Sequence, residues 1–115
     1  FIKPNFHQAG ALYDIVEPTS NVCNPAGKWN HVLLKINHLT NKGEVKLNGT
    51  KIVSFPLKGP TWDKLIENTK FRNIEDVNYS PLFNPNFGYF DTGKIGLQDH
   101  GDKVSYRNIK IREIK

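Results

Sequence analysis

A short stretch near the C-terminus concentrates the side chains best suited to chemistry. The sequence GLQDHG, residues 96–101, places Gln98, Asp99 and His100 side by side. An imidazole can accept or donate a proton near neutral pH, and neighbouring amides can position the hydroxyls of a polyhydroxylated ligand. His100 is therefore the candidate general base or acid. A histidine at a strand end is more often a surface or structural residue, and that alternative stays open.

Alternation predicts that residues 94–111 form a β-hairpin with two different faces. Ile95 and Leu97 should point into the core, and the polar side chains of both strands should gather on the opposite face. These polar residues are Gln98, His100, Tyr106 and Asn108. They surround Gly96, whose missing side chain leaves room for a ligand to lie against the sheet.

The same register predicts an ion pair within this hairpin. Asp99 would lie diagonal to Arg107 on the core face, within reach of a long side chain. Neither charge tolerates burial alone, so we expect a partly buried pair that holds the two strands together. Asp99→Ala would then cost about 2 kcal/mol or more.

Upstream, alternating runs separated by Asn, Gly and Pro predict strands joined by turns. Residues 29–37 predict a half-buried strand. Its core-facing positions are Val32, Leu34 and Ile36. Within residues 44–55, the pair Asn48 and Gly49 predicts a hairpin, because both turn positions need a positive φ. A purely structural role in this turn is the main interpretation of Asn48.

The alternation breaks at residues 60–69, where Thr61 can cap a short helix lying on the sheet. The apolar face of this helix would carry Trp62, Leu65, Ile66 and Thr69. Residues 70–93 then form a long loop rich in Asn and Pro, and such loops are usually functional or mobile. Its aromatic side chains could stack on a sugar, although anchoring of the loop to the core is the favoured interpretation. They are Phe83, Phe87, Tyr89 and Phe90.

Length and composition limit the other classes of function. A chain of 115 residues with 37% hydrophobic residues predicts one globular domain over residues 1–115. The formal charge of +5 makes nucleic acid or an acidic surface a partner to consider, but the lysines come singly between apolar residues, so we expect neither. No segment is long and apolar enough to span a membrane. Cys23 stands alone and excludes an internal disulfide.

Five blocks of the sequence together resemble a known family. They are GALYDIVEP at 10–18, PAGKWNHVLLKI at 25–36, KLNGTKIVSF at 46–55, TWDKLIENTKF at 61–71 and GKIGLQDHGDKVSYRNIKIREI at 93–114. Their order and approximate spacing resemble the 3-keto-disaccharide hydrolase family over nearly the whole chain. The pairing of GLQDHG with RNIKI is the most specific element. The resemblance implies an all-β, concanavalin-like jelly-roll β-sandwich with one short helix.

The resemblance also implies action on glycosides that carry a ketone at sugar carbon three. That ketone acidifies the C2 proton, so a base can abstract it to give an enediolate; the aglycone then leaves C1 by elimination, and water addition completes hydrolysis. His100 resembles the residue that transfers the proton, with Gln98 and Asp99 as contacting or orienting groups. The resemblance leaves open a divalent metal at the enediolate, with Asp99 or Glu17 as oxygen ligands.

Two features depart from the family pattern. Members often have a histidine before the LNG turn, where this chain has Lys46. The family domain is also longer at its N-terminal end, so this chain resembles its C-terminal portion and is expected to be truncated there. Half a sandwich leaves an apolar sheet face uncovered, so we expect a missing N-terminal segment or self-association to cover it. The family implies export to the periplasm or the cell surface.

A second interpretation is a non-catalytic carbohydrate-binding, lectin-like module on the same fold, and a third is an inert structural fragment. In the lectin-like module, aromatic rings stack on sugar rings while side-chain amides donate hydrogen bonds. The candidate sugar contacts are Tyr13, Trp29, Asn48, Tyr106 and Asn108. The remaining histidines, His7, His31 and His38, are weaker candidates, because no two have the spacing of a metal pair.

Overall fold

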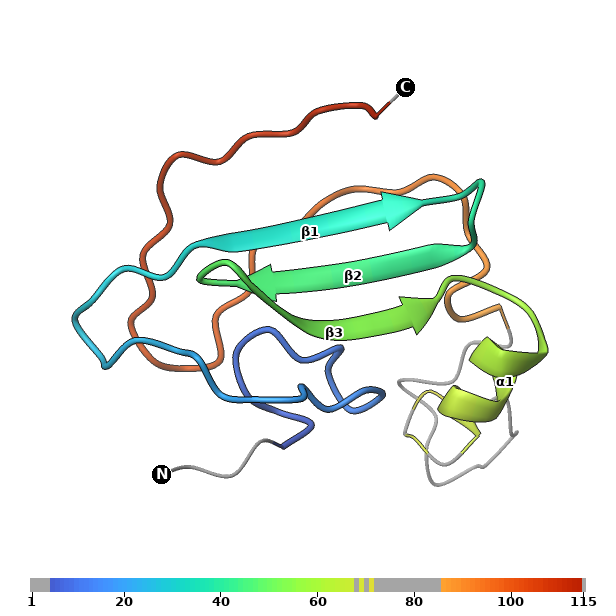
Figure 1. The fold of residues 1–115 in the computed structure, drawn as a ribbon, viewed down its shortest axis with the longest axis horizontal. Helices are drawn as coiled ribbons and strands as arrows, with labels where there is room; N and C mark the ends of the chain where they lie inside the picture. Colours follow the sequence, from blue (N-terminus) through green and yellow to red (C-terminus); the bar gives the residue numbers. More distant parts are fainter. Residues whose placement is uncertain (1–4, 68, 70, 72–85, 115) are drawn as a thin grey trace.

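The regular structure of the described residues is one small sheet and one helix. The computed structural model describes residues 5–67, 69, 71 and 86–114. Its elements are β1 (Val32–Asn37), β2 (Lys42–Leu47), β3 (Thr50–Pro56) and α1 (Pro60–Ile66). The strands pair antiparallel in the order β1-β2-β3, and α1 follows β3 (Figure 1). The predicted all-β class with one short helix is confirmed, and the two-sheet jelly roll remains a prediction.

The turn between β2 and β3 forms as predicted. Asn48 and Gly49 have φ values of 51° and 84°, the left-handed conformation that a two-residue hairpin turn requires. The Asn48 side chain also holds neighbouring segments in place. Its Oδ1 accepts the backbone N–H of His31 at 2.8 Å, and its Nδ2 donates to Val22 O and Asn30 Oδ1, both at 2.8 Å. The start of β1 is therefore tied to the β2–β3 turn.

A bulge in β3 builds most of the core. Val45 pairs with Val53 and Lys46 with Lys51, so Ile52 is the extra residue between them. The bulge lets the consecutive residues Ile52 and Val53 both be buried. The buried apolar cluster comprises Ile15, Val45, Leu47, Ile52, Val53, Phe55, Trp62 and Ile66. This core covers the part of the sheet formed by β2 and β3.

The β1 end of the same sheet face is open. The strand forms where it was predicted, but its expected half-burial is wrong. Val32, Leu34 and Ile36 lie opposite Leu47, Val45 and Gly43, and their exposed fractions are 58%, 62% and 39%. The N-terminal segment packs against β3 instead, where Thr19 N donates to Ile52 O at 2.8 Å. Nothing among the described residues covers β1 in the same way.

The hairpin predicted over residues 94–111 does not form, and that prediction is wrong. The described residues after 91 have no strand pairing, and their apolar side chains are exposed. Only the tip resembles a hairpin turn: Gly101 has a φ of 95° and its N–H donates to Asp99 Oδ1 at 3.3 Å. The last residues run along the outer side of β1 without a ladder to it (Figure 1). Alternation sets which side chains share a face, but a strand also needs a hydrogen-bonding partner.

Helix α1 is shorter than expected and begins differently. It ends at Ile66, with Gly59 at its N-cap and Pro60 at its first turn, so the proposed cap by Thr61 is wrong. Proline is suited to this position because the N–H that it lacks would have no partner in the helix. Trp62 and Ile66 are buried as predicted. Among the described residues, no helix is long and apolar enough to cross a membrane.

Two of the loop aromatics anchor the chain to α1. Trp62 Nε1 donates to Phe87 O at 3.1 Å, and Tyr89 OH donates to Asp63 Oδ1 at 2.5 Å. The anchoring interpretation is therefore confirmed for Phe87 and Tyr89. Phe90 is exposed, and Phe83 lies outside the described residues.

Candidate functional site

Two of the predicted site residues meet although they are far apart in the sequence. The ring centroids of Tyr13 and His100 lie 6.3 Å apart, with the ring planes at 52°. Tyr13 is half-buried in the N-terminal segment, and His100 is exposed in the turn that follows Asp99. The contact joins the GALYDIVEP block to the GLQDHG block, which the sequence alone did not bring together.

A tight turn presents Tyr13. Leu12 and Val16 form an isolated antiparallel bridge, with Leu12 N donating to Val16 O at 3.2 Å and Val16 N donating to Leu12 O at 2.9 Å. Asp14 lies at the tip with a φ of 66°, a conformation that Asp adopts more readily than most residues. The buried Ile15 anchors the turn to the core. This geometry holds Tyr13 and Asp14 at the surface beside each other.

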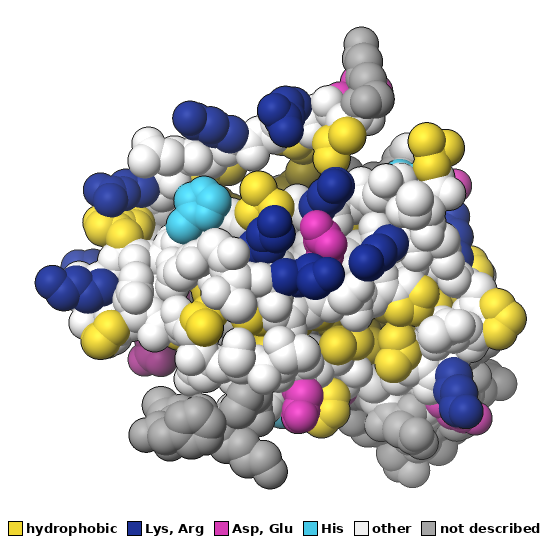
Figure 2. All heavy atoms as spheres, in the orientation of Figure 1, with side chains coloured by type: hydrophobic (Ala, Val, Ile, Leu, Met, Phe, Trp, Pro, Cys, Tyr) yellow, Lys and Arg dark blue, Asp and Glu magenta, His cyan; other side chains and the backbone are white. Residues whose placement is uncertain are grey.

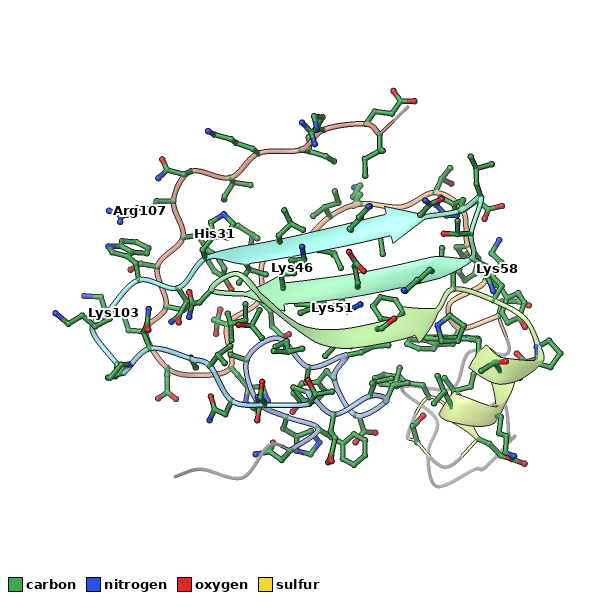
Figure 3. The ribbon with its side chains drawn as sticks, viewed as in Figure 1. His31, Lys46, Lys51, Lys58, Lys103 and Arg107 are labelled. Atoms are coloured by element: carbon green, nitrogen blue, oxygen red, sulfur yellow. The ribbon has the colours of Figure 1, made fainter. Side chains whose placement is uncertain are left out.

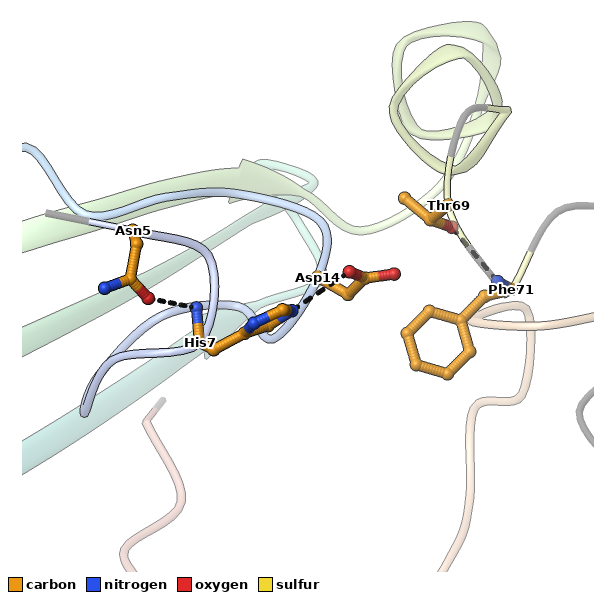
Figure 4. A network of polar contacts seen from close by, with 5 residues as sticks. All are labelled: Asn5, His7, Asp14, Thr69 and Phe71. Carbon is orange, nitrogen blue, oxygen red and sulfur yellow. Dashed lines mark hydrogen bonds and ion pairs between the residues drawn. The ribbon is translucent and has the colours of Figure 1, made fainter.

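His7 completes the group through a second ring contact with Tyr13. The two rings stack with centroids 4.7 Å apart and planes at 28°. A hydrogen bond of 3.2 Å joins His7 Nε2 to Asp14 Oδ1, and the backbone N–H of His7 donates to Asn5 Oδ1 at 2.8 Å (Figure 4). His7, Tyr13, Asp14 and His100 form what we call the two-histidine cluster. Two imidazoles and a carboxylate around a phenol can accept, donate and orient protons.

The sequence interpretation missed half of this cluster. His7 was one of three weaker histidine candidates, because no two of them have the spacing of a metal pair, and Asp14 was not singled out. No spacing rule links either residue to GLQDHG, since the contacts depend on how the N-terminal segment packs on β3. The Tyr-Asp pair within GALYDIVEP was the available signal, because it puts a phenol next to a carboxylate.

Asp99 and Gln98 shape the turn that carries His100. Asp99 Oδ1 accepts the Gly101 N–H, and Tyr106 OH donates to the backbone oxygen of Gln98 at 2.5 Å. The predicted Asp99–Arg107 ion pair is wrong. The Arg107 guanidinium carbon lies 3.9 Å from the centroid of the Trp29 ring, a cation–π contact. Without a strand ladder, nothing holds Arg107 in the register that would bring it to Asp99.

The other predicted sugar contacts are dispersed. Asn48 uses both polar side-chain atoms in the hydrogen bonds of the β2–β3 turn. Trp29 is half-exposed beneath Arg107, which Figure 3 shows at the end of the molecule near the start of β1. Asn108 has a φ of 55° in the exposed C-terminal segment. Within the described residues, no hydrogen bond or ring contact joins these three to the two-histidine cluster, and their roles remain predictions.

The resemblance suggested a divalent metal, but the described residues contain no set of side chains that could bind one. No three side chains of His, Cys, Asp or Glu are grouped to hold an ion there. Glu17 is exposed, and Asp99 is used by the Gly101 N–H. These residues do not fit a metal centre.

Comparison with known proteins covers almost all of the chain. Residues 3–112 match a family described as the 3-keto-alpha-glucoside-1,2-lyase-like domain. The chain is also 31% identical over 112 residues to a protein of Bacteroides thetaiotaomicron named 3-keto-disaccharide hydrolase. That alignment covers 96% of this chain and 37% of the relative, so the chain spans little more than a third of the relative's length. The family match includes every residue of the two-histidine cluster.

Proposed function

The chain belongs to the 3-keto-alpha-glucoside-1,2-lyase-like domain family, and from this premise we propose that it acts on glycosides oxidised to a ketone at sugar carbon three. The name of the similar hydrolase refers to the same ketone. The observation that carries the proposal is the two-histidine cluster, in which proton-transferring side chains converge from two separate segments of the matched region.

The ketone makes elimination the accessible route. It acidifies the proton on C2, and the neutral imidazole of His100 accepts that proton as general base. The electron pair of the C2–H bond then forms an enolate with the C3 carbonyl. When the carbonyl re-forms, a double bond forms between C1 and C2, and the C1–oxygen bond breaks with its electron pair on the aglycone. Water adds across the new double bond, with its oxygen on C1 and a proton on C2, which completes net hydrolysis.

The aglycone oxygen needs a proton as it leaves, and His7 is the group that we propose supplies it. The Asp14 carboxylate bonds to His7 Nε2 and so restricts how the imidazole is oriented. Tyr13 contacts both imidazole rings, and its phenol can hydrogen-bond a sugar hydroxyl there. In this scheme, one histidine acts at C2 and the other at the leaving oxygen.

Release of p-nitrophenol from a p-nitrophenyl 3-keto-glucoside tests the role of His100. We expect His100→Ala to lower kcat about a hundredfold or more, because a positioned general base contributes at least that factor. His38→Ala is the matched control, since His38 lies in the β1–β2 turn and belongs to no part of the cluster. Equal rates for wild type and His100→Ala would refute the assignment. Binding of the sugar by the folded chain without any release would favour the lectin-like alternative.

The role of His7 is tested by changing the leaving group. p-Nitrophenolate is stable without a proton, whereas a sugar alkoxide is not. We therefore expect His7→Gln to slow release of glucose from a 3-keto-disaccharide much more than release of p-nitrophenol. A His7→Gln variant that slows both substrates by the same factor would show that His7 is not the acid.

A further inference from the structure

The outer face of the sheet collects lysines from all three strands. Along β2 the buried residues Gly43, Val45 and Leu47 alternate with Lys42, Glu44 and Lys46, which point to the other face. The register places Lys35 of β1 opposite Glu44, and Lys51 of β3 opposite Lys46. We call Lys35, Lys42, Lys46 and Lys51 the basic face. Figure 2 shows Lys and Arg side chains gathered around a single acidic side chain on this side of the molecule.

The structure changes how these lysines are interpreted. In the sequence they come one at a time, as ordinary solvent-facing strand positions do. Pairing of the strands turns that spacing into one positive surface, with Lys46 and Lys51 beside each other (Figure 3). Like charges directly opposite each other in a sheet are unfavourable. Negative charge nearby offsets this repulsion.

The described residues supply little of that negative charge. The ion pairs of the described residues are His7–Asp14 and Lys58–Asp91, and neither involves the basic face. Glu44 is the acidic residue that the three strands place on this face, and it is shared among four exposed lysines. The face therefore carries a net positive charge that is open to solvent, and an anion that spans several lysines would neutralise it.

We propose that the basic face binds an anionic polysaccharide, with carboxylate groups of the polymer contacting Lys46, Lys51 and their neighbours. Single-stranded nucleic acid is a poorer fit, because its bases need aromatic rings to stack on, and the strand residues of this face include none. The choice of a sugar polymer among polyanions rests on the proposed function. The existence of the positive surface follows from the strand register and is independent of the proposed function.

Calorimetric titration with polygalacturonate at low ionic strength tests the proposal. Loss of two exposed charge contacts should lower the affinity of the Lys46→Gln/Lys51→Gln variant by about fivefold. The control variant Lys28→Gln/Lys64→Gln removes the same net charge at exposed positions outside the basic face, and its affinity should stay within about twofold of wild type. Glu44→Gln should strengthen binding. Added salt should weaken binding in every variant.

Three results would overturn the proposal. The first is an equal loss of affinity in the control variant, which would show that only net charge matters. The second is uncharged dextran binding as tightly as polygalacturonate. The third is a single-stranded oligothymidylate or a phosphatidylglycerol vesicle binding more tightly than the polysaccharide. The binding assay does not depend on turnover, so its outcome and that of the glycoside assay are separate results.

Thermal unfolding distinguishes lost binding from lost structure. Replacing Lys46 and Lys51 removes a repulsion between opposite residues, so the Tm of the double variant should be equal to or higher than that of wild type. Weaker binding together with an undiminished Tm is the expected combination. A lower Tm would show that the two lysines stabilise the sheet, and the basic face would then have a structural explanation.

Discussion

The β2–β3 hairpin and the C-terminal segment at 94–114 have similar sequence patterns and different structures. Both alternate apolar with polar residues around a turn containing glycine, and both were predicted to be hairpins. In the first, the apolar side chains are 1–8% exposed; in the second, Ile95, Leu97, Ile109 and Ile111 are 55–83% exposed. The first has a core against one face, whereas the second has neither a ladder nor a cover among the described residues. Alternation therefore predicts which side chains share a face, whereas a strand forms only where a neighbouring strand can pair with it.

The largest test of this contrast compares the same substitution in both regions. Ile52 is 1% exposed and Ile111 is 83% exposed. We expect Ile52→Ala to lower the free energy of unfolding by about 2–5 kcal/mol, because it opens a cavity, and Ile111→Ala to change it by less than about 0.5 kcal/mol. Urea denaturation measures both. If Ile52→Ala fails to fold, Ile52→Val against Ile111→Val gives a milder pair.

An equal loss of stability in the two isoleucine variants would contradict the contrast. It would mean that the C-terminal segment is packed in solution, with Ile111 covered by another part of the chain or by a second molecule. The concentration dependence of Tm would then separate self-association from intramolecular packing.

Glycine substitutions test the same contrast with a smaller effect. A Cβ on Gly43 would collide with the Phe55 ring on the neighbouring strand, whereas a Cβ on Gly96 would meet no atom of the described residues within 4 Å. We expect Gly43→Ala to cost about 1–3 kcal/mol through overpacking and Gly96→Ala to be near neutral. Thermal unfolding of the two variants, compared with wild type, measures this difference in Tm. A neutral Gly43→Ala would show that the hairpin is looser than its contacts indicate.

Asp99 sharpens the contrast because its two interpretations differ in magnitude. The predicted ion pair with Arg107 would make Asp99→Ala cost about 2 kcal/mol or more, whereas the single exposed bond to the Gly101 N–H gives an expected cost below about 1 kcal/mol. Arg107→Gln should lose about 0.5–1 kcal/mol of cation–π contact with Trp29. A double-mutant cycle over Asp99 and Arg107 should show no coupling. A strong coupling energy would show that Asp99 and Arg107 interact, as the predicted hairpin requires.

The smallest expected effect concerns the loop pinned near α1. The Lys58 ammonium hydrogen-bonds Asp91 and lowers the pKa of that carboxyl below its ordinary value of 3.8. Stabilisation from a lowered carboxyl pKa is present above pH 3.8 and is lost as the pH falls through the folded-state pKa. NMR titration should show the Asp91 midpoint moving up towards 3.8 in Lys58→Gln and staying in place in Lys64→Gln. An unchanged midpoint in Lys58→Gln would show that the ion pair between Lys58 and Asp91 does not form in solution.

Tyr89 in the same loop titrates in the opposite sense. Its hydroxyl donates to the Asp63 carboxylate, which raises the pKa of the phenol above its ordinary value of 10.0. Stabilisation from this raised pKa is present below pH 10.0 and is lost as the pH rises through the folded-state value. Asp63→Asn should therefore bring the ultraviolet titration of Tyr89 back towards pH 10.0. If the titration midpoint does not move, the bond to Asp63 does not form in solution.

The fold could be predicted where the information is local. The Asn48–Gly49 turn is set by backbone preference, and the strands around it follow from alternation over a few residues. The burial of β1 and the pairing of the C-terminal segment depend on which distant surface covers them, and alternation carries no information about that. The Ile52 bulge was also not predicted, since one extra residue does not change the local pattern visibly.

Two residues of the candidate site were predicted, but their contact was not. His100 and Tyr13 were both singled out, each for its own chemistry, but their contact depends on the N-terminal segment packing near the GLQDHG turn. For the same reason, His7 was ranked among the weaker candidates and Asp14 was not singled out. The basic face also could not be predicted from the sequence. Its lysines are separated along the chain and become neighbours only when the strands pair.

The central claim is that His100 removes the C2 proton of a 3-keto-glycoside, and exchange of that proton in D2O tests it most directly. The exchange requires only the first chemical step, so it can be observed by ¹H NMR even when elimination is slow. We expect the wild-type chain and His38→Ala to accelerate loss of the C2 signal, and His100→Ala to return it to the rate in buffer. Equal exchange with wild type and His100→Ala, or wild-type exchange at the buffer rate, would contradict the proposed function.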